Sequence, residues 1–159
     1  MGLIKGKSGI QKLLVGYPTM SDKYDVMPAT LSGADVVNGD VVMFTSDHSV
    51  YKKAASITDA SQLAGIVLAT NVKVATTYPA NSMNVPTKSG EQFNLVVKGF
   101  IAVELDSGAD LNSATEGTTV YVTSAGKLTT VSSSNVATNW RFTGVTETHG
   151  LAKVAEIKM

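Results

Sequence analysis

Two short stretches combine residue types that are used in catalysis. Ser46-Asp47-His48 contains the three residue types of a hydrolytic triad. Consecutive side chains of an extended chain point to opposite faces, so these three cannot form the relay that a triad requires. Gly6-Lys7-Ser8 resembles the end of a phosphate-binding loop, but the glycine needed five residues before Gly6 would fall on Met1. Neither stretch therefore predicts a nucleophile or a nucleotide site.

Acidic residues and histidines are the other candidates for chemistry. Glu104, Asp106 and Asp110 lie close together in the sequence, as paired carboxylates for acid–base work would. The favoured interpretation is a solvated strand end and loop, because the Asp-x-Asp spacing of a calcium loop is missing. His48 and His149 each lie in a predicted turn without a cluster of carboxylates, which argues against a metal site. We therefore predict no catalytic residue, no metal and no cofactor.

Trp140 is the only tryptophan, and the aromatic residues, 6% of the chain, are dispersed. This pattern predicts a core or interface anchor rather than a sugar-binding platform. A nucleic-acid surface would interleave lysines with aromatic residues, whereas the basic residues here are scattered except at the amino terminus.

Composition limits the class of protein further. Lys plus Arg equals Asp plus Glu at 13 each, there is no cysteine, and charged residues make up only 16%, against about 25% in a typical chain. Net charge therefore favours neither a nucleic-acid nor a membrane partner. No apolar run approaches the roughly 18 residues of a membrane span, and Leu13-Leu14-Val15 is too short for a signal peptide core. We expect a soluble, unprocessed protein.

A repeated pattern predicts the elements that carry these residues. Residues 117–131 form two β-branched runs around a Ser-Ala-Gly-Lys turn, which predicts a β-hairpin. Residues 39–52 repeat the pattern at an offset of 117 − 39 = 78 positions. Ala64-Gly65-Ile66-Val67 and Phe142-Thr143-Gly144-Val145 then follow at similar distances. The pattern indicates one unit built twice, and the alternative is a chance match of residues common in β proteins.

The whole chain is typical of a mainly β protein, a β-sandwich or barrel-like fold. We expect related halves at residues 25–75 and 99–159, joined by a loop at 76–98, within a β domain at 25–159. Pro28 marks an edge strand or a bend. Strands are predicted at residues 25–31, 41–45, 50–54, 63–70, 93–97, 100–105, 118–123, 127–131, 140–146 and 151–157.

Residues 1–24 differ from the rest, with frequent glycines, scattered apolar residues and no clear period. They are either a frayed terminus or an arm that becomes ordered on a neighbouring subunit. Fully extended, such an arm would reach roughly 80 Å. The residues that we expect to contact a partner are Lys5, Lys7, Ile10, Lys12, Leu13, Leu14 and Tyr17.

The order of short motifs resembles the decoration or cement proteins of tailed-phage heads. The motifs are V-x-x-G-D-x-V at 36–42, A-G-I-V at 64–67, G-x-x-x-V-x-L at 99–105, G-x-x-V-Y at 117–121, G-K-L-T at 126–129, T-G-V at 143–145 and a closing apolar strand at 154–157. The resemblance covers about residues 35–158 and leaves the arm unmatched.

This resemblance implies a structural virion protein that binds the outer surface of an assembled capsid and stabilises it. It implies the major capsid protein as partner, self-association as a trimer, and a place on the capsid surface after synthesis in the host cytoplasm. Such families carry no catalytic residues. The alternative is a carbohydrate- or receptor-binding β module of a phage fibre or tail, for which an exposed aromatic cluster would be the distinguishing feature.

Overall fold

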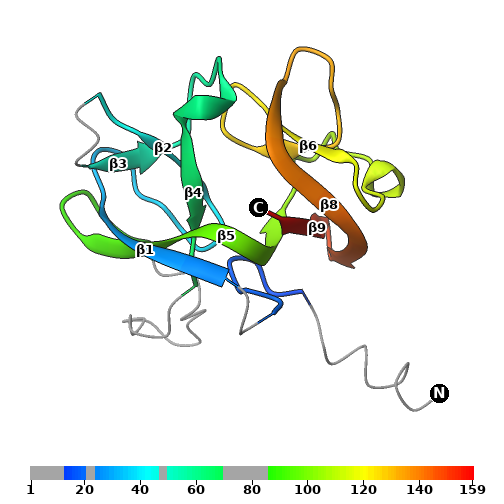
Figure 1. The fold of residues 1–159 in the computed structure, drawn as a ribbon, viewed down its shortest axis with the longest axis horizontal. Helices are drawn as coiled ribbons and strands as arrows, with labels where there is room; N and C mark the ends of the chain where they lie inside the picture. Colours follow the sequence, from blue (N-terminus) through cyan, green and yellow to red (C-terminus); the bar gives the residue numbers. More distant parts are fainter. Residues whose placement is uncertain (1–12, 21–23, 47–49, 70–85) are drawn as a thin grey trace.

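The computed structural model describes residues 13–20, 24–46, 50–69 and 86–159. They form a mainly β structure, a curled antiparallel sheet that makes a half-barrel (Figure 1). The strands are β1 (Tyr24–Thr30), β2 (Val41–Phe44), β3 (Tyr51–Lys53), β4 (Leu63–Val67), β5 (Gln92–Glu104), β6 (Thr119–Val122), β7 (Leu128–Thr129), β8 (Val136–His149) and β9 (Ala152–Lys158). In this described part of the chain, the loops also contain the short 3₁₀ helices η1 (Ala60–Gln62) and η3 (Leu111–Ser113). The predicted fold class is confirmed.

The sheet has the strand order β3-β2-β4-β5-β9-β8-β6-β7, and β1 pairs with β5. Strand β5 connects its two parts, because its first half pairs with β1 and β4 and its second half pairs with β9. The prediction of two strands at 93–97 and 100–105 is therefore wrong. Gly99 lies between them with a φ of +120°, which a glycine adopts without strain, so the strand continues through it. The expected linking loop at 76–98 accordingly includes residues 92–98 of β5.

Both predicted hairpins are confirmed. Phe44 pairs with Tyr51 across β2 and β3, and Tyr121 pairs with Thr129 across β6 and β7. The outer strand of each hairpin also forms a parallel bridge to the end of an earlier strand, Leu31 to Tyr51 and Leu105 to Leu128. The two hairpins thus occupy equivalent places at the two ends of the strand order (Figure 1).

Two clusters of buried side chains make up most of the core. One, around Leu31, Val42 and Leu95, lies among β1 to β5. The other, around Ile101, Val120 and Phe142, lies among β5 to β9 and also packs against the opposite face of β2 and β4. In β6 fully buried side chains alternate with half-buried ones, as the period of two in a half-buried strand requires. Three consecutive residues of β2, Val41–Met43, are buried because the two clusters lie on its two faces.

Other predicted elements are found with shifted bounds. Pro28 lies in β1, which pairs only with β5 among the described strands, so the prediction of an edge position is confirmed. The last strand, predicted at 151–157, is β9, and the strand predicted at 140–146 is part of the longer β8. Asp47, His48 and Thr70, the last residue of the strand predicted at 63–70, lie outside the described residues.

Candidate functional site

Residues 13–19, which we call the arm root, lie along the edge of β5 that β9 leaves open. The backbone N–H of Gly16 donates to the Ala102 carbonyl at 2.8 Å, and the N–H of Ala102 donates to the Tyr17 carbonyl at 3.2 Å. The N–H of Thr19 donates to the Phe100 carbonyl at 3.0 Å. These bonds satisfy backbone groups that an open strand edge would leave unpaired. The arm expected at 1–24 therefore includes a segment that belongs to the domain, and β1 begins within it at Tyr24.

A tight turn directs the arm root away from β5. The N–H of Tyr17 donates to the Leu14 carbonyl at 3.0 Å, and Gly16 has a φ of +83° at the third position of this turn, where glycine is favoured. Gly16 also packs directly on the turn at Asn38 and Gly39. A Cβ on Gly16 would lie 2.7 Å from the Gly39 nitrogen, so the close approach requires a glycine.

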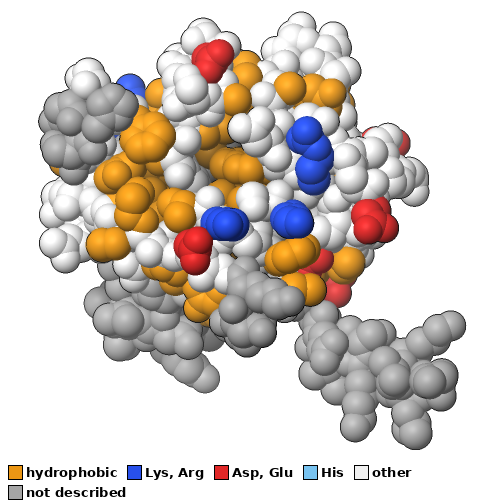
Figure 2. Space-filling view, in the orientation of Figure 1, with side chains coloured by type: hydrophobic (Ala, Val, Ile, Leu, Met, Phe, Trp, Pro, Cys, Tyr) orange, Lys and Arg blue, Asp and Glu red, His pale blue; other side chains and the backbone are white. Residues whose placement is uncertain are grey.

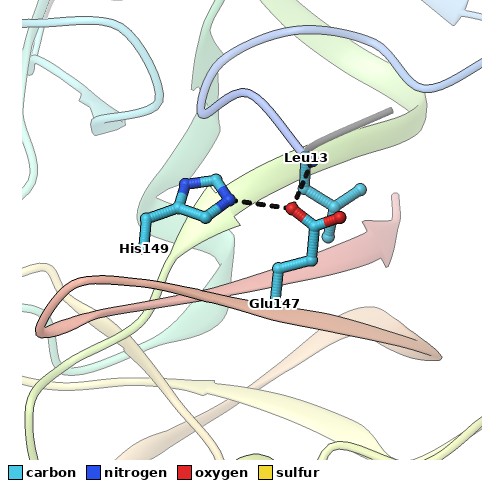
Figure 3. Close-up of polar contacts among 3 residues, drawn as sticks. All are labelled: Leu13, Glu147 and His149. Atoms are coloured by element: carbon cyan, nitrogen blue, oxygen red, sulfur yellow. Dashed lines mark hydrogen bonds and ion pairs between the residues drawn. The ribbon is translucent and has the colours of Figure 1, made fainter. Parts of the chain in front are cut away.

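The first described residue, Leu13, is held at both its side chain and its backbone. Its side chain is buried with Ala102 and Val154. Its N–H donates to Oε2 of Glu147 at 2.7 Å, and Nε2 of His149 lies 2.8 Å from the same oxygen (Figure 3). Glu147 and His149 are two positions apart on β8, so their side chains point to the same face.

An apolar groove borders the arm root. It encloses about 550 Å³ and is lined by Leu13, Leu14, Tyr17, Pro18, Thr19, Val145 and Glu156. Leu14 and Val145 are 43% and 47% exposed. We call the side chains of Leu14, Tyr17, Pro18 and Val145 the arm-root surface. Exposed apolar side chains that gather along one groove are typical of an interaction site.

A second cavity, of about 310 Å³, lies on the side of the arm root that faces the Asn38 turn and the β6–β7 hairpin. Its acidic and basic lining residues are Asp40, Glu104, Lys127 and His149. In the view of Figure 2, hydrophobic side chains are spread over the molecule with charged ones scattered among them, in keeping with the low charged content of 16%.

The structure brings three of the predicted contact residues together. Leu13, Leu14 and Tyr17 all lie in the arm root and line the same groove. The other four, Lys5, Lys7, Ile10 and Lys12, lie outside the described residues. Trp140 is partly buried against the larger core cluster, and its role as an interface anchor stays a prediction.

Sequence reasoning missed Glu147, His149 and Val145. Glu147 lies just beyond the strand predicted at 140–146, and His149 is predicted in a turn. Both belong to β8, so the prediction of a turn at His149 is wrong and the sequence did not indicate that the two side chains share a face. The bond from Leu13 to Glu147 spans 134 residues, and no local pattern signals such a contact.

The acidic residues near the end of β5 have structural roles. Oδ2 of Asp106 accepts from the Gly108 N–H at 3.0 Å. Asp110 caps η3, accepting from the Asn112 N–H at 3.0 Å and from the Ser113 hydroxyl at 2.9 Å. These hydrogen bonds, with the backbone bond from Asn112 the largest contribution, lower the pKa of Asp110. The interpretation as a solvated strand end and loop is confirmed, because Glu104 is the exposed last residue of β5 and Asp106 and Asp110 lie in the loop that follows.

Within the described ranges, no group of three or more His, Asp or Glu side chains could hold a metal ion. No helix in the same part of the chain is long and apolar enough to cross a membrane.

Comparison with known families decides the relationship. A family model described as "Structural cement protein (E217 gp24/Pam3 gp6)" matches residues 8–157. The chain belongs to this family. The match to the cement proteins begins well before residue 35, so it includes the arm root, which the motif resemblance left uncovered. Comparison with curated protein sequences finds no match.

The fold of this cement protein is also similar to a solved structure. A chain of "The capsid of Myoviridae Phage XM1" superposes with a TM-score of 0.67 at 16% sequence identity. The similarity covers 92% of this chain and 89% of that chain. At this identity the likeness concerns the fold alone, and it extends over nearly the whole of both chains.

Proposed function

We propose that this cement protein binds the outer surface of an assembled tailed-phage capsid and stabilises the shell, without catalysing a reaction. The observation that carries the proposal is the family match across residues 8–157. The fold likeness to a chain of a phage capsid supports it. The partner that we assign is the major capsid protein, and the protein's place is on the virion.

Stabilisation by a cement protein follows from mass action. A protein that binds the assembled lattice but not the loosened shell favours the former by about 2.7 kcal/mol per site at a hundredfold excess over Kd. A shell presents many copies of each site, so modest affinity per site is sufficient. The functional surface is then a broad contact of roughly 800 Å² per partner rather than a catalytic centre.

We assign the shell contact to the arm-root surface and to the residues that precede it. Leu14 and Val145 are each a little under half exposed, so burying the remaining apolar area would stabilise a contact by about 1 kcal/mol each, roughly half the value for complete burial. Lys5, Lys7, Ile10 and Lys12 all lie within the eight residues before Leu13, so a contact at the arm root and a contact by the arm would be continuous.

Self-association as a trimer remains a proposal that rests on the family resemblance, with Trp140 as a candidate anchor. Light scattering of the purified protein would measure it directly, and a monomeric mass at working concentrations would contradict it. The carbohydrate- or receptor-binding alternative is not favoured, because the family match points to a capsid role.

The test is to add purified protein to undecorated heads and measure co-sedimentation and the temperature at which the heads rupture. Binding that saturates and raises the rupture temperature is expected. Leu14→Asp should weaken binding at least tenfold, about 1.4 kcal/mol, because it places a charge in the contact. Val131→Asp is the matched control, since Val131 is 40% exposed but lies after β7 rather than in the groove. Heads that neither bind the protein nor gain stability would contradict the proposal.

A further inference from the structure

Glu147 and His149 form a small polar cluster at the point where the described chain begins. Oε2 of Glu147 lies 2.7 Å from the Leu13 nitrogen and 2.8 Å from Nε2 of His149 (Figure 3). The two side chains are 25% and 30% exposed. Their strand is held in place by pairing with β9, Glu147 opposite Val154 and His149 opposite Ala152. A rigid strand thus presents a charged acceptor to the backbone of the arm root.

The bonded N–H has a particular position along the chain. The turn at residues 14–17 carries Leu13 off the pairing edge of β5 and over its face, so the Leu13 N–H lies beyond the bond between Gly16 and Ala102. The Leu13 side chain rests on Ala102 and Val154, on the outer face of β5 and β9. The carboxylate of Glu147 therefore binds a backbone N–H that lies beyond the pairing with β5. This N–H belongs to Leu13, the residue after Lys12.

We propose that Glu147, oriented by His149, is a positioning residue that fixes where the N-terminal arm leaves the domain and so directs the arm toward the shell. This inference rests on the proposed function for its second part. Both residues are partly exposed and lie outside the large core clusters around Phe142 and Leu95. Loss of the carboxylate should consequently release the arm root while the rest of the domain stays folded.

Trypsin tests the first part, because it cleaves after Lys12 and the bond that it cuts contains the N–H held by Glu147. In full-length Glu147→Ala, cleavage after Lys12 should rise about tenfold to a hundredfold, the effect of losing one hydrogen bond to a charged group. Glu147→Gln retains an oxygen that can accept from Leu13 and should lie between Glu147→Ala and wild type. Cleavage after Lys5 and Lys7 in the same molecules is the internal reference.

The control variant is Glu116→Ala, which removes an exposed carboxylate at the start of the second hairpin. It should leave cleavage after Lys12 unchanged, and the thermal midpoint of each variant reports whether the domain remains folded. An unchanged rate after Lys12 in Glu147→Ala, or an equal rise in Glu116→Ala, would overturn the positioning role.

A double-mutant cycle on head binding tests the second part. Glu147→Ala and the pair Lys5→Gln, Lys7→Gln are measured singly and together in the full chain. If Glu147 positions the arm, their effects on Kd are coupled, and the combined loss is smaller than the product of the separate losses. Additive losses in a protein that binds heads would overturn this part and leave the proposed function intact. If wild-type protein does not bind heads, the proposed function and this second part fail, while the trypsin result still decides whether Glu147 holds the arm root.

Discussion

Replacing Gly16 by alanine should undock the arm root without unfolding the domain. Gly16 has a φ of +83°, and an added Cβ would lie 2.7 Å from the Gly39 nitrogen and 2.9 Å from Asn38 Cβ. A side chain in the left-handed region costs about 1–2 kcal/mol. Overpacking against a backbone that cannot easily move adds roughly 1–3 kcal/mol. Together the two costs destabilise the docked arm root by about 2–5 kcal/mol.

The docking of that segment is of similar strength. Burial of Leu13 contributes about 2 kcal/mol, and each backbone bond to Ala102, Ala69 and Phe100 contributes about 1 kcal/mol net. Ordering the backbone opposes this by at least 1 kcal/mol per residue. The net free energy of docking is therefore small, so the cost of Gly16→Ala is large enough to undock the arm root.

Hydrogen exchange at two amides measures the effect. The N–H of Ala69 donates to the Gly16 carbonyl at 2.8 Å, and the N–H of Ala102 donates to the Tyr17 carbonyl at 3.2 Å. In Gly16→Ala both should exchange at least about thirtyfold faster, the equivalent of 2 kcal/mol. Gly33→Ala is the matched control, because Gly33 has a φ of +87° with nothing within 4 Å of the added Cβ. Exchange that is unchanged in Gly16→Ala, or raised equally in Gly33→Ala, would show that the close approach at Gly16 does not hold the arm root in place.

Two further predictions concern the domain itself. Phe142 is 1% exposed at the centre of the larger core cluster, so Phe142→Ala should lower the free energy of unfolding in urea by about 3–5 kcal/mol, and a loss below about 1 kcal/mol would contradict this packing. The pKa of Asp110 is lowered from 3.8, chiefly by the hydrogen bond from the Asn112 N–H and then by the Ser113 hydroxyl. The charged carboxylate therefore stabilises the folded protein at pH values above 3.8. This stabilisation is lost as the pH falls through the lowered pKa. Asp110→Asn should therefore be less stable than wild type at neutral pH and less sensitive to acid in this window, and unfolding curves with the same pH dependence as wild type would count against it.

Local patterns were sufficient for the elements that depend on local chemistry. The two hairpins follow from β-branched runs around turn residues, and Gly126, in the second turn, has the positive φ of +79° that this turn requires. Residues 152–158 form a strand although Leu151, Val154 and Ile157 also suit a helix by spacing, because β9 pairs with β5 and β8. Tertiary pairing resolves the ambiguity there.

Features that depend on distant contacts were missed. The sequence predicts a break between two strands at Gly99. The strand β5 instead continues, because β1 pairs with it before this position and β9 pairs with it after. For the arm root, the sequence predicts either a frayed terminus or an arm ordered on a neighbouring subunit. Its partners within the chain, Ala102, Glu147 and Gly39, are far away in the sequence and give no local signal. The candidate site is assembled from such contacts, so the sequence predicts its residue types but not its geometry.

The predicted duplication remains a proposal with new support. The first unit has the strand order β3-β2-β4-β5-β1, in which β5 contributes its first half. The second unit has the order β7-β6-β8-β9-β5, in which β5 contributes its second half. The two orders are equivalent when the strands of each unit are counted along the chain. The bridges from Leu31 to Tyr51 and from Leu105 to Leu128 are also equivalent. We infer that the fold consists of two related units that share β5, rather than two halves joined by a loop. Expression of each unit alone would test its independence.

The central claim is that the arm-root surface faces the shell of an assembled head, and a cryo-microscopy map of decorated heads tests it most directly. We expect density for this protein on the outer surface, with Leu14 and Val145 against the major capsid protein and the chain before Leu13 running onto the shell. A map in which the arm root faces solvent, or in which the protein is absent from the capsid, would contradict it.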